Sequence, residues 1–454
     1  MNVSIIGTGY VGLTTGACLA FLGHQVTCVD SDERKVEALH HGKIPFYEPH
    51  MAELVAEARS NLCFTTQYAD AIPKAQVVFI AVGTPSGASG APDLRYLEAA
   101  ARAIGEHLPG EFVVVVNKST VPIGSGNWVE SIVRGAYELR NRRKANGAFA
   151  VASNPEFLRE GSAILDSLYP DRVVIGTDDQ RTAEVLYSLY RPILDQKFQP
   201  PSYVPRPDGF GAVPLISADL ASAELIKYAA NAFLALKISY INEIGQLAEK
   251  VGADIGRIAK GIGLDARIGT RFLQAGIGWG GSCFGKDTAA LIATASEYGL
   301  DAPIVTAARE INRRQRERVV DKLLGELKIL KGRTIGMLGL AFKPHTDDLR
   351  EAPALDIARK LIERGARVKA HDPVAMERFR KENADLDVTC CAAPQDVAED
   401  ADALVVVTEW PQYRELDWQA VKSSMRTPVL LDGRNLLDRE AMIRLGFRYV
   451  TLAG

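Results

Sequence analysis

A glycine-rich turn near the amino terminus constrains the fold of this chain more than any other feature. The apolar run at residues 3–6 leads into GTGYVG at residues 7–12, and a helix-like segment, LTTGACLAFLG, follows. In such a strand–turn–helix the first glycine permits the tight turn, the second lets the backbone approach a pyrophosphate, and the third lets helix and strand pack closely. The N–H groups that open the helix then face the phosphate charge. The turn predicts dinucleotide binding by Gly7, Gly9, Tyr10, Val11 and Gly12, and the alternative is a glycine-rich loop without a ligand.

An acidic residue at the end of the next predicted strand refines this prediction. Asp30 follows the run at 26–29 and lies 18 residues after Gly12. A carboxylate in this place accepts hydrogen bonds from the ribose hydroxyls and repels the 2′-phosphate of NADP. We therefore expect NAD as the cofactor. Lys35, on the following helix, could reach a phosphate, although a solvated surface lysine explains it equally well.

The first part of the chain, residues 1–212, has the pattern of a dinucleotide-binding Rossmann-like domain. β-branched runs alternate there with helix-like segments, as in βαβ units and a parallel sheet. A connector rich in Pro and Gly, at residues 199–214, cannot continue a helix and closes this part. The strands predicted here are Val3–Ile6, Val26–Val29, Val77–Val82, Val113–Asn117, Phe149–Ala152 and Val173–Ile175.

The pattern changes twice more, which agrees with a prior of about 150 residues per domain for a chain of 454 residues. Residues 213–318 are predicted to be helical and include an apolar helix over 218–251, about 50 Å long and suited to a subunit or domain interface. Residues 319–454 return to an α/β pattern, with predicted strands Thr334–Leu338, Arg367–Ala370, Ala403–Val407 and Val429–Leu431. The predicted fold class is α/β, with a central helical domain between two Rossmann-like domains.

Composition excludes several other classes of protein. Hydrophobic residues make up 47% and charged residues 24%, and the net charge is −3, so neither a disordered chain nor the basic surface of a nucleic-acid or membrane binder is expected. The six cysteines are scattered, without the spacing of a zinc site or a disulfide framework. This spacing predicts no metal site. No signal peptide and no apolar run of about 18 residues is found, so we expect a cytoplasmic protein.

One cysteine stands in a setting that favours chemistry. Cys283 lies in the loop GWGGSCFGKD at 278–287, beside Lys286 and Asp287. Glycines allow a ligand to approach, and a nearby cation lowers the pKa of a thiol. An isolated cysteine is more often an inert small hydrophobe, so this position needs further support.

Two pairs of polar residues with a spacing of four add candidates. Glu156 and Glu160, in NPEFLREG at 154–161, would share one face of a helix, although a solvated acidic face is the commoner explanation. Lys227 and Asn231 interrupt a very apolar stretch, where a buried amine needs a partner. An amine and an amide side by side could stabilise an oxyanion.

Two hydroxyl-bearing turns follow predicted strands of the first domain. Thr84 lies in GTPS at 83–86 and Thr120 in STVP at 119–122. Ligands of an open α/β sheet bind at the carboxyl ends of strands, but a Ser/Thr-Pro turn is more often only a turn.

Taken together, these motifs resemble those of the nucleotide-sugar dehydrogenases, the family that includes UDP-glucose and GDP-mannose dehydrogenases. The resemblance covers nearly the whole chain. It rests on the motifs above together with FYEP at 46–49, ELIKYAANAF at 224–233 and GLAFKPHTDDLREAP at 339–353. One departure is His50, where many members have Gly after YEP.

The resemblance implies roles for individual residues. It implies Cys283 as nucleophile, Lys227, Asn231 and Asp287 as groups that stabilise oxyanions and manage water, and Thr120 and Glu160 near the nicotinamide. It implies further cofactor contacts at Thr84, Lys286 and Arg350. The implied nucleotide-sugar contacts are Glu156, Phe157, Leu158, Arg159, Glu160, Lys227, Asn231, Phe272, Leu273, Gln274, Ala275, Gly276, Gly280, Lys343 and, from the neighbouring subunit of a homodimer or larger assembly, Arg267.

The implied reaction is a four-electron oxidation of UDP-glucose, favoured over GDP-mannose by general similarity. The third domain begins GLAF, without G-x-G-x-x-G, and the resemblance gives it the UDP part of the substrate. Two alternatives remain: a one-hydride hydroxyacid dehydrogenase, which needs a lysine but no nucleophilic cysteine, and a non-catalytic NAD-binding or nucleotide-sensing protein. The NADH formed per substrate, two, one or none, separates the three.

Overall fold

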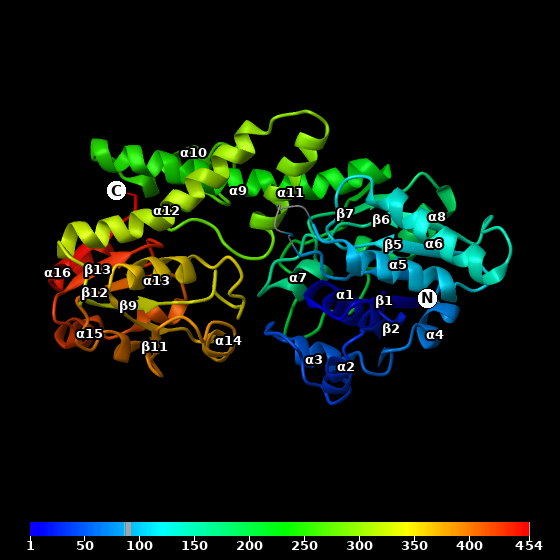
Figure 1. Cartoon of the computed structure of the whole chain (residues 1–454), viewed down its shortest axis with the longest axis horizontal. Helices are drawn as coiled ribbons and strands as arrows, with labels where there is room; N and C mark the ends of the chain where they lie inside the picture. The colour runs from blue at the N-terminus through cyan, green and yellow to red at the C-terminus, as the bar shows by residue number, and fades with distance from the viewer. Residues whose placement is uncertain (86, 88–91, 454) are drawn as a thin grey trace. The chain divides into compact units, whose positions relative to one another are not determined.

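The computed structural model describes residues 1–85, 87 and 92–453, so Ser86 of the predicted GTPS turn lies outside the described residues (Figure 1). The chain divides into two compact units, residues 1–229 and 230–454, and the division falls inside one long helix. The three-part division at residues 212 and 318 stays a prediction.

The first unit contains an eight-stranded sheet with the strand order β3-β2-β1-β4-β5-β6-β7-β8. Neighbouring strands are parallel except β6 and β7, which pair antiparallel. The order reverses between β1 and β4, which is where doubly wound sheets bind their ligands. The strands are β1 (Asn2–Ile6), β2 (Gln25–Val29), β3 (Leu62–Thr65), β4 (Val77–Ile80), β5 (Val113–Asn117), β6 (Phe149–Ser153), β7 (Val173–Gly176) and β8 (Leu215–Ala218).

Helices cover both faces of this sheet and create a core on each. Along β5, Val114 and Val116 belong to one core while Val113 and Val115 belong to the other, because successive side chains of a strand point to opposite faces. A strand buried on both faces is therefore a continuous apolar run. The helices are α1 (Tyr10–Phe21), α2 (Glu33–His40), α3 (Met51–Glu57), α4 (Tyr68–Ala71), α5 (Arg95–His107), α6 (Ser125–Asn141), α7 (Ala163–Leu168) and α8 (Gln180–Leu194).

The predicted long helix is α9 (Leu220–Val251). A buried carboxylate fixes its first turns, since Glu224 accepts hydrogen bonds from the backbone N–H groups of Gly124 (2.6 Å) and Gly126 (2.8 Å) at the start of α6. Burial raises the pKa of Glu224, and the two N–H groups offset part of that rise. The start of α9 is thereby anchored to the sheet that carries the glycine-rich turn.

The second unit contains a six-stranded parallel sheet with the order β11-β10-β9-β12-β13-β14, the same winding as the first six strands of the first sheet. This shared strand order confirms the prediction of a Rossmann-like sheet at each end of the chain. The strands are β9 (Thr334–Leu338), β10 (Arg367–His371), β11 (Val388–Cys390), β12 (Ala403–Val406), β13 (Val429–Asp432) and β14 (Arg448–Thr451). The remaining helices are α10 (Ile255–Gly263), α11 (Phe284–Glu297), α12 (Pro303–Leu327), α13 (Pro353–Glu363), α14 (Met376–Glu382), α15 (Trp418–Ser424) and α16 (Arg439–Arg444).

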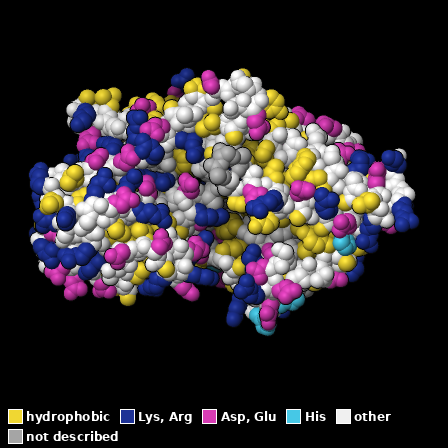
Figure 2. Space-filling model, viewed as in Figure 1, with side chains coloured by type: hydrophobic (Ala, Val, Ile, Leu, Met, Phe, Trp, Pro, Cys, Tyr) yellow, Lys and Arg dark blue, Asp and Glu magenta, His cyan; other side chains and the backbone are white. Residues whose placement is uncertain are grey.

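Charged side chains of both signs are interspersed over the face drawn in Figure 2, without a continuous basic stripe there. Across the described part of the chain, no helix has the length and apolarity needed to cross a membrane. The same residues hold no group of three or more His, Cys, Asp or Glu side chains that could ligate a metal.

Candidate active site

The glycine-rich turn has the conformation that the sequence predicts. Gly7 has φ = 101°, and its N–H donates to the Val29 carbonyl over 2.7 Å. A Cβ on Gly12 would lie 1.9 Å from the Gly7 oxygen, whereas a Cβ on Gly9 would meet no protein atom within 4 Å. Gly7 and Gly12 are therefore required by the protein's own packing, and the space at Gly9 is open to a ligand. No side chain caps the start of α1, which leaves its first N–H groups available to a phosphate.

Asp30 is held beside this turn. One carboxylate oxygen accepts hydrogen bonds from the Thr8 N–H (2.9 Å) and hydroxyl (2.6 Å), and the other accepts from the Asp32 N–H (3.0 Å). Burial alone would raise the pKa of Asp30, but these hydrogen bonds and Lys35, 3.7 Å away, hold it below its usual value. An ionised carboxylate at the end of β2, with room above Gly9, fits the ribose and pyrophosphate of a dinucleotide.

The second sheet has a similar turn, with a glycine of positive φ after its first strand and an aspartate after its second strand. Gly339, with φ = 105°, occupies the place that Gly7 has in the first sheet, and Asp372 follows β10 as Asp30 follows β2. The Asp372 carboxylate accepts hydrogen bonds from four backbone N–H groups and from the Trp410 indole. Both Asp372 oxygens are thus engaged by N–H donors of the protein itself.

The turns after β4 and β5 are tied together near the reversal of strand order. The Thr84 hydroxyl donates to the Thr120 carbonyl over 2.8 Å, and the Ser119 hydroxyl donates to the Val82 carbonyl over 2.8 Å. The structure therefore brings Thr84 and Thr120 together, each in the turn that follows one of two neighbouring strands. Their contacts with a cofactor stay predictions.

The predicted helical face shared by Glu156 and Glu160 is wrong. Residues 154–159 have no regular structure, and Glu160 lies in the turn before α7. Pro155 disfavours helical backbone at the residue before it, and Glu156 accepts the Leu158 N–H over 2.6 Å, which closes a local turn. The two carboxylates therefore do not share the face of a helix.

Glu156 forms a buried ion pair with Lys227. The Lys227 ammonium donates to its carboxylate over 2.8 Å. Burial would raise the pKa of Glu156, but the charge and hydrogen bond of Lys227 outweigh it and hold this pKa below its usual value. The Phe157 ring has two cations near it: its centroid lies 3.6 Å from the Arg172 guanidinium and 5.4 Å from the Lys227 ammonium. The partner that the buried amine required is thus the first acid of the NPEFLREG motif.

Glu48 belongs to the FYEP motif, and the sequence alone predicted no role for it. Its carboxylate accepts hydrogen bonds from the N–H groups of Gly161 (2.6 Å) and Ala163 (2.7 Å), and from the Tyr10 hydroxyl. Burial, followed by the charge of Glu48, raises the pKa of Tyr10. Tyr10 and Glu48 therefore connect the glycine-rich turn to the turn that carries Glu160. The Arg159 guanidinium donates two hydrogen bonds to the Asp166 carboxylate.

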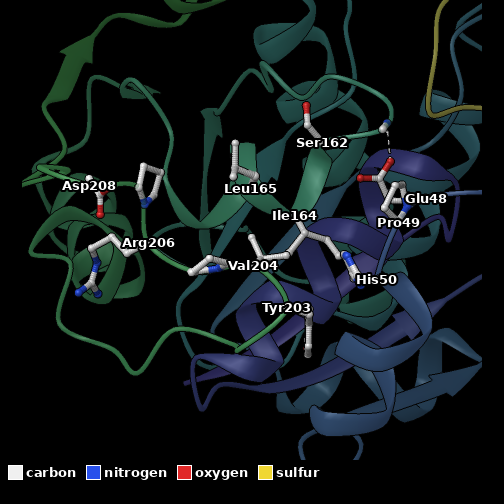
Figure 3. Close-up of a pocket in the computed structure, with 13 residues that line it drawn as sticks. Glu48, Pro49, His50, Ser162, Ile164, Leu165, Tyr203, Val204, Arg206 and Asp208 are labelled. Carbon is white, nitrogen blue, oxygen red and sulfur yellow. Dashed lines mark hydrogen bonds between the residues drawn. The ribbon is translucent and has the colours of Figure 1, made fainter. Parts of the chain in front are cut away.

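A pocket of about 550 Å³ lies beside Glu48 (Figure 3). Its walls come from the end of FYEP together with His50, from the start of α7 with Leu165, and from the connector before β8 with Tyr203 and Arg206. His50 has φ = 63°, in the left-handed region that favours glycine, and its ring stacks on that of Tyr203 with the ring centroids 5.4 Å apart. None of the residues predicted for catalysis, cofactor or substrate lines this pocket.

In the second unit Cys283 is the N-cap residue of α11 and is half-buried. A helix N-terminus favours the anionic form of a thiol placed there. Several glycines of its loop make room for the protein itself: a Cβ on Gly280 would lie 2.5 Å from the Glu351 carbonyl oxygen, and one on Gly281 would lie 2.7 Å from the Phe342 ring. These glycines allow the loop to pack closely against residues 339–353. The sequence alone predicted them only as space for a ligand.

Asp287 lies one turn further along α11 and is fully buried. One oxygen accepts the Lys286 ammonium over 2.6 Å, and the other accepts the Asn231 amide over 2.6 Å. Three predicted site residues, Asn231, Lys286 and Asp287, are therefore in direct contact. Asn231 stands four residues after Lys227 on α9, so one helix carries both polar side chains.

The loop predicted to contact the nucleotide sugar is held by three side-chain amides, of which those of Asn242 and Gln315 are buried. The Gly276 N–H donates to Asn242 and its carbonyl accepts from Gln315, each over 2.8 Å, and the Asn435 amide donates to the Ala275 carbonyl over 3.0 Å. Phe272 has φ = 65°, Leu273 and Gly280 are buried, and Gln274 is exposed.

The remaining predicted contacts are charged side chains with partners of their own. Arg267 is exposed and pairs with Asp265 over 2.6 Å, and Arg350 pairs with Asp348 over 2.8 Å. The Lys343 ammonium lies 5.5 Å from the Phe342 ring. Their roles toward a ligand stay predictions.

Three family models match the chain in order. Residues 1–194 match the NAD-binding domain of the UDP-glucose/GDP-mannose dehydrogenase family, residues 221–314 its central domain, and residues 336–439 its UDP-binding domain.

Full-length relatives agree with these models. UDP-glucose 6-dehydrogenase TuaD of Bacillus subtilis is 46% identical, over 99% of this chain and 92% of that protein. The UDP-glucose 6-dehydrogenase of Rhizobium meliloti is 45% identical, over 100% of this chain and 99% of that protein. A solved UDP-glucose dehydrogenase from Pyrobaculum islandicum superposes with a TM-score of 0.89 at 40% identity, covering 100% of this chain and 97% of that one. The chain therefore belongs to the UDP-glucose/GDP-mannose dehydrogenase family and is an NAD-dependent oxidoreductase.

Proposed function

We propose that this enzyme oxidises the primary alcohol of UDP-glucose to the carboxylate of UDP-glucuronate, through a covalent intermediate on Cys283. Relatives of 39–46% identity that carry the name UDP-glucose 6-dehydrogenase support this substrate. The observation that carries the covalent mechanism is the place of Cys283 at the N-terminus of α11, one turn before the buried Asp287.

The balance of the reaction requires two oxidations of the same carbon. One alcohol, two NAD⁺ and one water yield one carboxylate, two NADH and three protons. NAD, when bound, accepts one hydride in each oxidation. The glycine-rich turn, the first N–H groups of α1 and Asp30 would hold it, with Thr84, Thr120, Glu160, Lys286 and Arg350 as the further contacts that the family resemblance implies.

The cysteine solves the problem of the second oxidation. The aldehyde formed first has no alkoxide that can expel a hydride. Addition of the Cys283 sulfur to the carbonyl carbon creates a thiohemiacetal, whose oxygen loses its proton as the hydride leaves. The product is a thioester; water attacks its carbonyl carbon, the C–S bond breaks, and the thiol is restored.

Other side chains of the chain would stabilise charge and move protons in these steps. Lys227 and Asn231 are donors suited to an oxyanion on the reacting carbon. Asp287 and Glu160 are acids suited to hold water and accept its proton. Glu156, paired with Lys227, would fix the direction of that ammonium on the sugar side.

We further propose a homodimer or larger assembly in which the second half of α9 is buried. Phe233, Tyr240, Leu247 and Val251 are exposed and recur with spacings of seven, seven and four, so they share one face of the helix. Arg267 would then complete the site of the neighbouring subunit. Because a nucleophilic thiol must stay reduced, we propose the cytoplasm as its location.

The test counts NADH against substrate. Purified enzyme is given limiting UDP-glucose with excess NAD, and in parallel GDP-mannose, UDP-galactose and UDP-N-acetyl sugars. Two NADH per UDP-glucose, with little turnover of the others, are expected. One NADH per substrate would indicate a one-hydride enzyme, and no NADH with any sugar would indicate a binding protein. Preference for GDP-mannose would show that UDP-glucose is the wrong substrate, while the four-electron mechanism would stand.

A further inference from the structure

Lys118 is a buried cation that the proposed mechanism does not use. It follows β5 directly, in the turn that carries Thr120, and only 8% of its surface is exposed. Its ammonium donates to the Asn154 side-chain oxygen over 2.9 Å and lies 6.0 Å from the Phe79 ring. A lysine is almost never buried to this extent without a specific reason.

Asn154, the first residue of NPEFLREG, is held on several sides. Its side-chain oxygen also accepts the Tyr190 hydroxyl from α8 (2.5 Å), and its side-chain nitrogen donates to the Val174 carbonyl in β7 (2.7 Å). The amide positions Lys118 but does not neutralise its charge. Lys118 and Tyr190 therefore share one acceptor, the first as a cation and the second as a neutral donor.

The carboxylate whose negative charge acts on Lys118 is that of Glu156, which forms its ion pair with Lys227 of α9. Two amines and one carboxylate thus occupy a region from which water is excluded. Burial lowers the pKa of Lys118 to about 8, Glu156 offsets part of that change, and Lys227 adds to it. Lys118 in turn helps to keep the pKa of Glu156 low.

We propose that Lys118 is a positioning residue of the reaction, which holds Asn154 at the start of the NPEFLREG loop and adds its buried positive charge to that of Lys227 around the Glu156 carboxylate. The inference rests on the proposed function, because Lys227 and Glu156 take their roles from it. It adds a residue to the site that touches neither sugar nor cofactor and acts through its neighbours.

The first test compares pH profiles of kcat for wild type, Lys118→Met, Lys118→Arg and Tyr190→Phe. The ratio of wild-type to Lys118→Met activity is expected to be about tenfold near pH 7 and to fall towards one as Lys118 loses its proton, above about pH 9. Lys118→Arg stays charged, so its kcat relative to that of wild type should rise over the same pH range. Tyr190→Phe removes the neutral donor at the same oxygen, so its ratio to wild type should not change with pH. A Lys118→Met ratio that is also independent of pH would overturn the proposal.

The second test needs no activity. Lys118 has a folded pKa of about 8 and an unfolded value of about 10.5. The unfolded chain therefore binds more protons between these values, and the stability of wild type relative to Lys118→Met should rise with pH across that window. If the difference in urea midpoint between wild type and Lys118→Met does not change with pH, Lys118 is not a buried cation and the proposal fails. If no nucleotide sugar is oxidised, the proposed function fails, whereas this measurement still decides whether Lys118 carries the charge.

Discussion

The Lys227 ammonium and the Glu156 carboxylate lie 2.8 Å apart, and only 5% and 6% of their side chains are exposed. They come from α9 and from the loop after β6, which are 71 residues apart in the chain. A pair so deeply buried is retained at a cost in desolvation, which is a reason to look for its use in chemistry.

Breaking this pair should destabilise the protein. Lys227→Met leaves a buried carboxylate without its cation, and we expect a loss of about 3–5 kcal/mol in the free energy of unfolding. Replacing both residues, Lys227→Met with Glu156→Leu, should cost much less than the two single changes together. Urea unfolding of the four proteins measures this, and simple additivity would contradict the assignment of a coupled pair.

Two neighbouring glycines should respond in opposite ways to the same substitution. Gly12→Ala places a Cβ 1.9 Å from the Gly7 oxygen, so the fold itself should be destabilised. Gly9→Ala meets no protein atom within 4 Å, so unfolding should be little changed while NAD affinity falls by about tenfold or more. Thermal unfolding and NAD titration separate the two effects. Unchanged NAD binding in Gly9→Ala would place the pyrophosphate elsewhere.

Asp30 should set the preference for NAD over NADP. In Asp30→Asn the negative charge that opposes the 2′-phosphate is removed, and the amide oxygen keeps an acceptor for only one of the two backbone N–H groups, that of Thr8 or that of Asp32. We expect kcat/KM for NAD to fall and the preference over NADP to narrow by about tenfold. Equal wild-type rates with both cofactors at low concentration would refute the role of Asp30.

Arg267 tests the assembly. Arg267→Ala and Cys283→Ala should each be nearly inactive alone. If Arg267 completes the neighbouring site, mixed subunits should regain about a quarter of wild-type activity, since in a random mixture half of the dimers are mixed and each of these holds one intact site. A fully active monomer, or no recovery on mixing under conditions of subunit exchange, would contradict the proposed contact.

The sequence predicted the central strands better than the edges of the sheets. Val113–Asn117 and Thr334–Leu338 have the predicted limits, because strands buried on both faces are continuous apolar runs. The four strands that sequence reasoning missed, β3, β8, β11 and β14, are the edge strands of the two sheets. Each of these strands has three or four residues and is partly exposed. Polar and apolar residues are mixed over so short a segment that no continuous apolar run indicates a strand.

Within the site, the sequence predicted residue types better than their partners. The need of Lys227 for a counter-charge followed from its apolar surroundings, but the partner, Glu156, lies 71 residues away and had been placed on a helix that does not form. Glu48 and Lys118 were missed because their importance comes from burial and from contacts distant in sequence. The only local signal was their place inside the FYEP motif and beside the STVP motif.

The central claim is that Cys283 forms a covalent bond with the substrate. The most direct measurement is the uronate formed from UDP-glucose and NAD by Cys283→Ala, with Cys63→Ala, which changes an exposed cysteine on β3, as the matched control. We expect both variants to bind NAD and UDP-glucose. Uronate formation should fall by about three orders of magnitude or more in Cys283→Ala and stay near the wild-type rate in Cys63→Ala. Uronate production by Cys283→Ala at a rate close to wild type would contradict the covalent mechanism.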